Sequence, residues 1–177
     1  MSDAASTPLA RGATKVVIDT NVVLDLWLYI DPRVSALRDD LEKGVLQWVA
    51  TQPMREELAR VLQYEHIQSR LAKGAESWVG LEQQEKEQEQ EGPIVKAKAY
   101  FASGQFILDH MQRLAHFEEP APKAHFVCKD GDDQKFIDLA QRHQACLISK
   151  DKAVLSMKNR MARVGVSIVP VYASASA

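Results

Sequence analysis

Val16-Val17-Ile18-Asp19-Thr20-Asn21-Val22-Val23 is the stretch from which the fold can be worked out. It opens with three β-branched apolar residues, a run typical of a strand buried on both faces. An acid, a hydroxyl and an amide end the run, and apolar residues then resume close to helical spacing. Ligands of open α/β sheets bind just beyond the carboxyl ends of the strands. Asp19 is therefore either a ligand-binding carboxylate or only the N-cap of the next helix, and this stretch alone leaves both open.

The alternation of apolar runs with helical patterns continues to the end of the chain. We predict further strands at Val45–Ala50, His125–Cys128, Ala145–Ser149 and Val166–Val169. Helices are predicted between them, among them one that begins after Thr51, one over Ile94–Phe117 and one over Lys152–Arg163. Strands that alternate with helices imply an α/β fold with a parallel sheet and right-handed crossovers.

Length and composition limit the number of domains that the chain can form. Its 177 residues predict a single domain, which we place at 15–172 between a disordered tail at 1–14 and a second tail at 173–177. Within the domain, 65–117 is predicted as a polar helical segment, and its run Glu82–Glu91 contains only Glu, Gln and Lys. That run is either a loop or a solvated helix face, and the Gly-Pro pair that follows it favours the loop.

The net charge is −2, so any nucleic-acid site has to be a local basic patch. No stretch approaches the roughly 20 apolar residues of a membrane span, and residues 1–14 lack the apolar centre of a secretory signal. We therefore expect a cytoplasmic protein with no membrane association.

The acidic residues fall at related positions of the predicted elements. Asp19 and Asp151 each follow a strand, Asp132 and Asp133 start a helix, and Glu57 lies early in a helix that follows a strand. A parallel sheet brings these positions to one edge, where the carboxylates repel each other unless cations neutralise them. Oxygen-only ligands suit Mg²⁺ or Mn²⁺, which can activate water and stabilise the leaving oxygen of a phosphodiester. Each acid alone also fits a helix cap or a surface residue, but their shared position predicts a joint site.

Together these motifs resemble the PIN-domain nucleases. The matching pieces are Val-Ile-Asp19-Thr-Asn21, Glu56-Glu57-Leu58, Asp130-x-Asp132-Asp133-x-Lys135-Phe136 and Leu-Ile-Ser149-Lys150-Asp151. The resemblance runs from Lys15 to Pro170 apart from the middle segment, and is strongest to bacterial PIN proteins described as toxins of toxin–antitoxin pairs. It implies a PIN-like three-layer α/β/α sandwich, a central parallel sheet of order 3-2-1-4-5, and Mg²⁺- or Mn²⁺-dependent cleavage of RNA.

The resemblance also implies roles for individual residues. The metal ligands and catalytic residues would be Asp19, Glu57, Asp133 and Asp151, with Glu56 and Asp132 as the alternatives to their neighbours. Asn21 would orient the first aspartate, and the basic Lys150 and Lys152 are candidates for binding phosphates of the substrate backbone. One departure is Ala153, which stands where many relatives carry another acid, so that the site is expected to be poorer in ligands on that side and to hold a single tight ion.

We therefore predict a divalent-metal-dependent endoribonuclease that cleaves single-stranded RNA by metal-activated water. The resemblance further implies a toxin of a toxin–antitoxin pair, with an antitoxin partner and a homo-oligomeric state. A haloacid-dehalogenase phosphatase would need an acid at Asn21, and a receiver domain would need a phosphate-accepting aspartate after its third strand. The remaining alternative is a catalytically weak PIN-like scaffold that binds RNA or protein.

Overall fold

The computed structural model describes residues 14–83 and 99–174, with side chains described at 14–75 and 99–174. The predicted tails lie outside the described residues, apart from Thr14, which belongs to the first strand, and residues 173 and 174. Most of the Glu/Gln run, from residue 84 onward, also lies outside them.

Five parallel strands form one sheet of order β3-β2-β1-β4-β5, which confirms the predicted topology. The strands are β1 (Thr14–Ile18), β2 (Leu46–Thr51), β3 (Ala115–Glu118), β4 (Cys146–Ile148) and β5 (Ser167–Val169). β1 lies at the centre, and its Val16 and Val17 are fully buried, as expected for a strand covered on both faces. The register pairs Ile18 with Ile148, so the residues that follow β1 and β4 emerge side by side.

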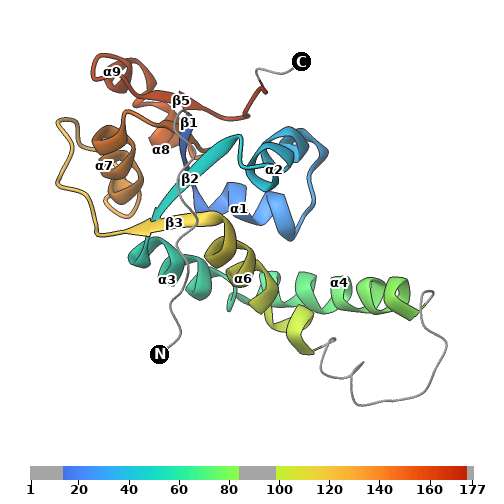
Figure 1. Cartoon of the computed structure of the whole chain (residues 1–177). Helices are drawn as coiled ribbons and strands as arrows, with labels where there is room; N and C mark the ends of the chain where they lie inside the picture. Colours follow the sequence, from blue (N-terminus) through green and yellow to red (C-terminus); the bar gives the residue numbers. More distant parts are fainter. Residues whose placement is uncertain (1–13, 84–98, 175–177) are drawn as a thin grey trace, which may run out of the picture.

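Helices cover both faces of the sheet, and the fold is a three-layer α/β/α sandwich (Figure 1). On one side lie α1 (Thr20–Trp27), the 3₁₀ helix η1 (Pro32–Val34), α2 (Ser35–Glu42), α3 (Gln52–Val61) and α6 (Gln105–Leu114). On the other lie α7 (Gln134–His143), α8 (Lys152–Leu155) and α9 (Lys158–Ala162). The helix predicted over 152–163 is thus two short helices.

The segment between α3 and α6 contributes helix α4 (Glu65–Gln83), which extends away from the sheet (Figure 1). Its first half is not simply polar, because Ile67, Leu71 and Ala75 are buried against the rest of the domain. No helix in the described part of the chain is both long and apolar enough to cross a membrane.

Two sequence predictions for the third strand were wrong. The helix predicted over 94–117 ends at Leu114, and the next four residues form β3 at the edge of the sheet. β3 has no fully buried residue, so it lacks the apolar run by which a central strand is recognised. His125–Cys128, which does carry an apolar run, is irregular loop instead.

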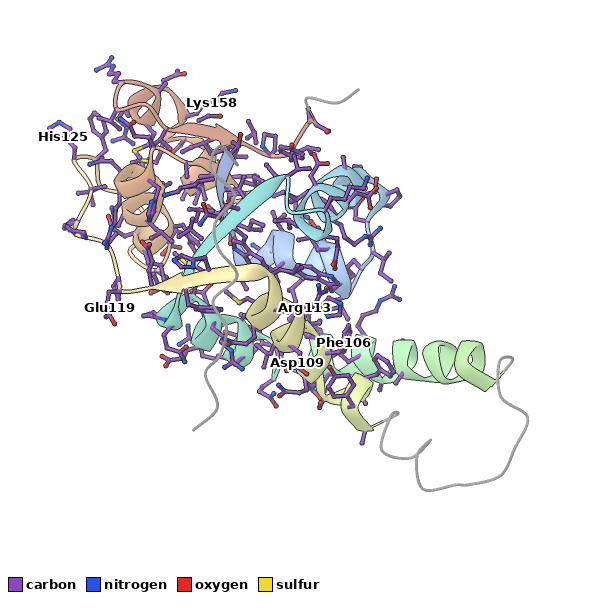
Figure 2. The ribbon with its side chains drawn as sticks, viewed as in Figure 1. Phe106, Asp109, Arg113, Glu119, His125 and Lys158 are labelled. Atoms are coloured by element: carbon purple, nitrogen blue, oxygen red, sulfur yellow. The ribbon has the colours of Figure 1, made fainter. Side chains whose placement is uncertain are left out.

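The backbone of this loop forms hydrogen bonds with side chains of α7 instead of with a neighbouring strand. Gln134 accepts a hydrogen bond from the Cys128 amide at 2.7 Å and donates to the Phe126 carbonyl at 3.2 Å. Gln141 accepts from the His125 amide at 3.0 Å. These contacts give the loop hydrogen-bond partners on α7, including one for the amide of the buried Cys128, without strand pairing. Figure 2 shows His125 beside α7, and Glu119 where the chain leaves β3.

Candidate active site

Asp19 occupies the carboxyl end of the central strand and is only 3% exposed. Its Oδ2 accepts a hydrogen bond of 2.5 Å from Ser149 Oγ, and its Oδ1 accepts one of 3.4 Å from the Asn21 amide. Burial raises the pKa of Asp19, and the nearby charges of Glu57 and Asp151 add to the shift. Asp19 is therefore the N-cap of α1, and it also belongs to a cluster of acids, so that its role as a ligand stays a prediction.

Ser149 lies in one of the matching motifs but was assigned no role from the sequence, although it joins two of the predicted site residues. It is fully buried directly after β4, and its Oγ also accepts a hydrogen bond of 3.1 Å from the Asp151 amide. The signal that could have found it is the register, because Ser149 follows β4 where Asp19 follows the neighbouring β1. Ser149 therefore links Asp19 to the backbone of Asp151.

Asp151 is the N-cap of α8. Its Oδ1 accepts hydrogen bonds from the amides of Ala153 at 2.6 Å and Val154 at 3.2 Å. These bonds use one carboxylate oxygen and fix the direction of the side chain. The half-buried Asp151 is close enough to Asp19 and Asp133 for its negative charge to raise the pKa of both carboxyl groups.

Glu57 comes to the edge from α3 on the opposite face. Thr20 Oγ1 donates a hydrogen bond of 2.6 Å to its Oε1, and Lys135 forms an ion pair with its Oε2. Neither Thr20 nor Lys135 was assigned this role from the sequence. The neighbouring Glu56 is exposed and bonds to Gln52 within α3, so Glu57 is the residue that the fold brings to the other acids.

Asp133 precedes α7, but its side chain makes no capping hydrogen bond. Burial raises its pKa to about 7, and the charges of Asp19, Asp151, Asp130 and Glu57 contribute to the shift. Asp132 is exposed, so Asp133 is the member of this pair that interacts with the cluster. The turn before it is held by Asp130, whose Oδ1 accepts from the Asp132 amide at 2.9 Å.

The remaining predicted residues have different surroundings. Lys150 forms an ion pair with Asp25 of α1, a residue that is 5% exposed, and so ties the end of β4 to α1. Lys152 is exposed at the start of α8, beside Asp151. The side chain of Asn21 is exposed, and its contact with Asp19 is made by its backbone amide.

The donor set suits a hard divalent cation. Asp19, Glu57, Asp133 and Asp151 offer only oxygen. Burial, and after it mutual repulsion, raises the pKa of Asp19 and Asp133, and a bound cation would relieve the repulsion. Within the described residues, however, no three acidic, histidine or cysteine side chains are already gathered tightly enough to hold a metal ion. Metal binding at this edge therefore requires side chains to rotate toward each other.

A family model for the PIN domain matches residues 15–153, which is most of the chain. The chain belongs to the PIN domain family. No curated protein and no solved structure matches it. The matched range contains all four clustered acids, so they lie within the PIN domain itself. PIN domains are generally nucleases that typically use divalent metal ions, which agrees with an acidic edge of oxygen donors.

Proposed function

We propose that this PIN domain is an Mg²⁺- or Mn²⁺-dependent endoribonuclease that cleaves single-stranded RNA. The observation that carries the proposal is the convergence of Asp19, Asp133 and Asp151 with Glu57 at the carboxyl edge of the sheet. Among the described residues, Lys135 is the one cationic side chain paired with any of these four acids. A surplus of negative charge at this edge favours the binding of a divalent cation.

The residues of the chain support water rather than a side chain as the nucleophile. A bound divalent ion supplies an activated water and neutralises charge on the scissile phosphate. The two hydroxyls beside the acids, those of Thr20 and Ser149, are buried and donate to Glu57 and Asp19, so neither is free to attack a substrate.

RNA as the substrate rests on the resemblance to PIN nucleases, and the exposed Lys152 beside Asp151 is suited to contact a flanking phosphate. We further propose that the protein is a cytoplasmic toxin, inhibited by an antitoxin encoded beside it, and that it forms a homo-oligomer. Co-expression with the product of an adjacent small gene tests this part: a stable complex that suppresses cleavage supports it, and the absence of such a gene contradicts it.

The test of the chemistry is end-group analysis of RNA cut by the purified protein. Attack by water on the phosphorus breaks its bond to the 3′ oxygen and gives 5′-phosphate and 3′-hydroxyl ends. Attack by the ribose 2′-hydroxyl instead gives a 2′,3′-cyclic phosphate. We expect the former, abolition by EDTA, and a loss of about 100-fold or more in Asp19→Asn. Asp39→Asn, an exposed acid of α2, is the matched control and should cut normally.

Cyclic-phosphate ends, or cleavage that survives EDTA, would contradict this mechanism. A protein that binds Mn²⁺ but cuts no RNA would leave the PIN-like binding scaffold as the better description.

A further inference from the structure

Lys135 lies at a place where its helix does not favour a cation. It is the second residue of α7, next to the positive end of the helix dipole, and the first turn of α7 contains no acidic residue to offset it. Within α7 the ammonium of Lys135 lies over the ring of Phe136, 4.9 Å from its centroid, and the negative charge that compensates it comes from outside the helix.

The compensation comes from Glu57 on the opposite side of the sheet. The ammonium of Lys135 pairs with Glu57 Oε2 and also donates to the carbonyl oxygen of Asp132. The two side chains are largely shielded from water, with Lys135 26% and Glu57 16% exposed. Since Thr20 donates to Oε1, both carboxylate oxygens of Glu57 already have a partner.

The other three acids differ from Glu57 in this respect. Asp19 accepts from Ser149 and the Asn21 amide, Asp151 caps α8, and neither forms an ion pair within the described part of the chain. Asp133 likewise has no ion pair there. Among the described residues, the cluster thus divides into one carboxylate paired with a cationic side chain, Glu57, and three that have no such partner.

We propose that Lys135 is a positioning residue that takes the place of a second divalent cation. It neutralises Glu57 and keeps that carboxylate from binding metal, so the domain binds one Mg²⁺ or Mn²⁺, held by Asp19, Asp133 and Asp151. The inference rests on the proposed function, because it presupposes that this edge binds a divalent ion. Ala153, which leaves the edge without a further acid, points to the same single ion.

The test counts bound Mn²⁺ by calorimetry and by the electron paramagnetic resonance signal of free Mn²⁺, using the metal-free full-length chain. We expect one ion per chain in the wild type and two in Lys135→Met, because Glu57 is then free to bind metal. Lys158→Met is the matched control: Lys158 also begins a helix, α9, is exposed, and has no ion-pair partner among the described residues (Figure 2). This variant should bind one ion.

Glu57→Gln provides an independent measurement, which also serves if Lys135→Met does not fold. If Glu57 is not a ligand, this variant keeps one ion with an affinity within about threefold of the wild type, well below the tenfold that 1.4 kcal/mol represents. Loss of the ion in Glu57→Gln, two ions in the wild type, or an unchanged count in Lys135→Met would each overturn the inference.

RNA cleavage assayed on the same preparations separates the two proposals. If the wild type cuts RNA in a Mn²⁺-dependent way but one of the three overturning results is obtained, the proposed role of Lys135 is wrong and the proposed nuclease function is retained. A wild type that neither binds Mn²⁺ nor cuts RNA overturns both.

Discussion

Three of the four acids at the carboxyl edge are held by partners of different kinds, and these single contacts decide what each residue can do. A buried hydroxyl fixes Asp19, helix amides fix Asp151, and an ammonium and a hydroxyl fix Glu57. Asp133 has no such contact, which is why burial and neighbouring charges move its pKa so far.

Ser149→Ala should weaken the site without removing an acid. It deletes the 2.5 Å bond to Asp19 and leaves the Asp151 amide without its acceptor. We expect a loss of roughly 1–3 kcal/mol in the free energy of unfolding and about a tenfold loss of cleavage or Mn²⁺ affinity. Urea denaturation and Mn²⁺ titration measure the two effects. Ser156→Ala, which removes an exposed hydroxyl of the same region, is the control, and an equal response of both variants would contradict a special role for Ser149.

The stability of the metal-free protein should depend on pH through Asp133. Its pKa is about 7 in the folded state against 3.8 in the unfolded chain, so between these values the folded state holds a proton that the unfolded state has lost. The contribution of this group to the free energy of unfolding is therefore fully present below pH 3.8 and is lost as pH rises through about 7. We expect the melting temperature without metal to fall from about pH 5 to about pH 8, and to fall less in Asp133→Asn. Identical slopes would show that Asp133 does not titrate in this range.

Asp133→Asn and Asp132→Asn should also differ in cleavage. Asp133 interacts with the other acids whereas Asp132 is exposed, so only the first substitution is expected to cost about 100-fold. A larger loss of cleavage in Asp132→Asn than in Asp133→Asn would show that Asp132 is the acid that cleavage requires.

At the scale of elements, α7 does more than cover the sheet. Its first and middle turns supply Gln134, Asp138 and Gln141, which bond to backbone groups of the loop before it. That loop leads into the Asp130–Asp133 turn, so the helix sets the path by which the third acid arrives.

Gln134→Ala tests this arrangement. The Cys128 amide belongs to a residue only 4% exposed, and losing its acceptor should cost roughly 1–3 kcal/mol in the free energy of unfolding. Amide exchange in the loop should also become faster than in the wild type. Gln112→Ala, on an exposed position of α6, is the matched control and should change stability by less than about 0.5 kcal/mol. Unchanged exchange in the loop of Gln134→Ala would show that other contacts hold it.

At the scale of the whole molecule, the acids come from both helical layers and meet over the central strands. Glu57 arrives from the α3 side, and Asp133 and Asp151 arrive with α7 and α8 from the other. A cation held by Asp19, Asp133 and Asp151 would therefore join the central strand to the layer of α7 and α8, and it would do so only in the folded state.

Mn²⁺ should accordingly raise the melting temperature of the intact domain. At a free concentration of about 100 times Kd, binding stabilises by about 2.7 kcal/mol, which corresponds to about 5–10 °C in a chain of this size. Asp19→Asn should lose most of this gain and melt higher than the wild type without metal, because one repelling charge is gone. Differential scanning calorimetry with and without EDTA measures both, and an unchanged metal response in the variant would place the ion elsewhere.

The sequence by itself determined the parallel α/β architecture and the place of Asp19 at the carboxyl end of the central strand. Both follow from local patterns: apolar runs such as Val16–Ile18 report burial on two faces, and an acid that directly follows such a run must lie at the strand's end. The position of β3 was decided only by the tertiary structure, because a half-exposed edge strand has no such pattern and the apolar run at His125–Cys128 finds its partners on α7.

The contacts that tune the acids were also decided only by the tertiary structure. Ser149 reaches Asp19, Lys135 reaches Glu57, and Lys150 turns to Asp25. Each pair joins residues far apart in the chain, and a polar side chain carries no periodic signal of where its partner lies. Burial can be read from the sequence because it repeats along a strand or helix, whereas the partner of a buried charge is fixed only when distant elements pack together.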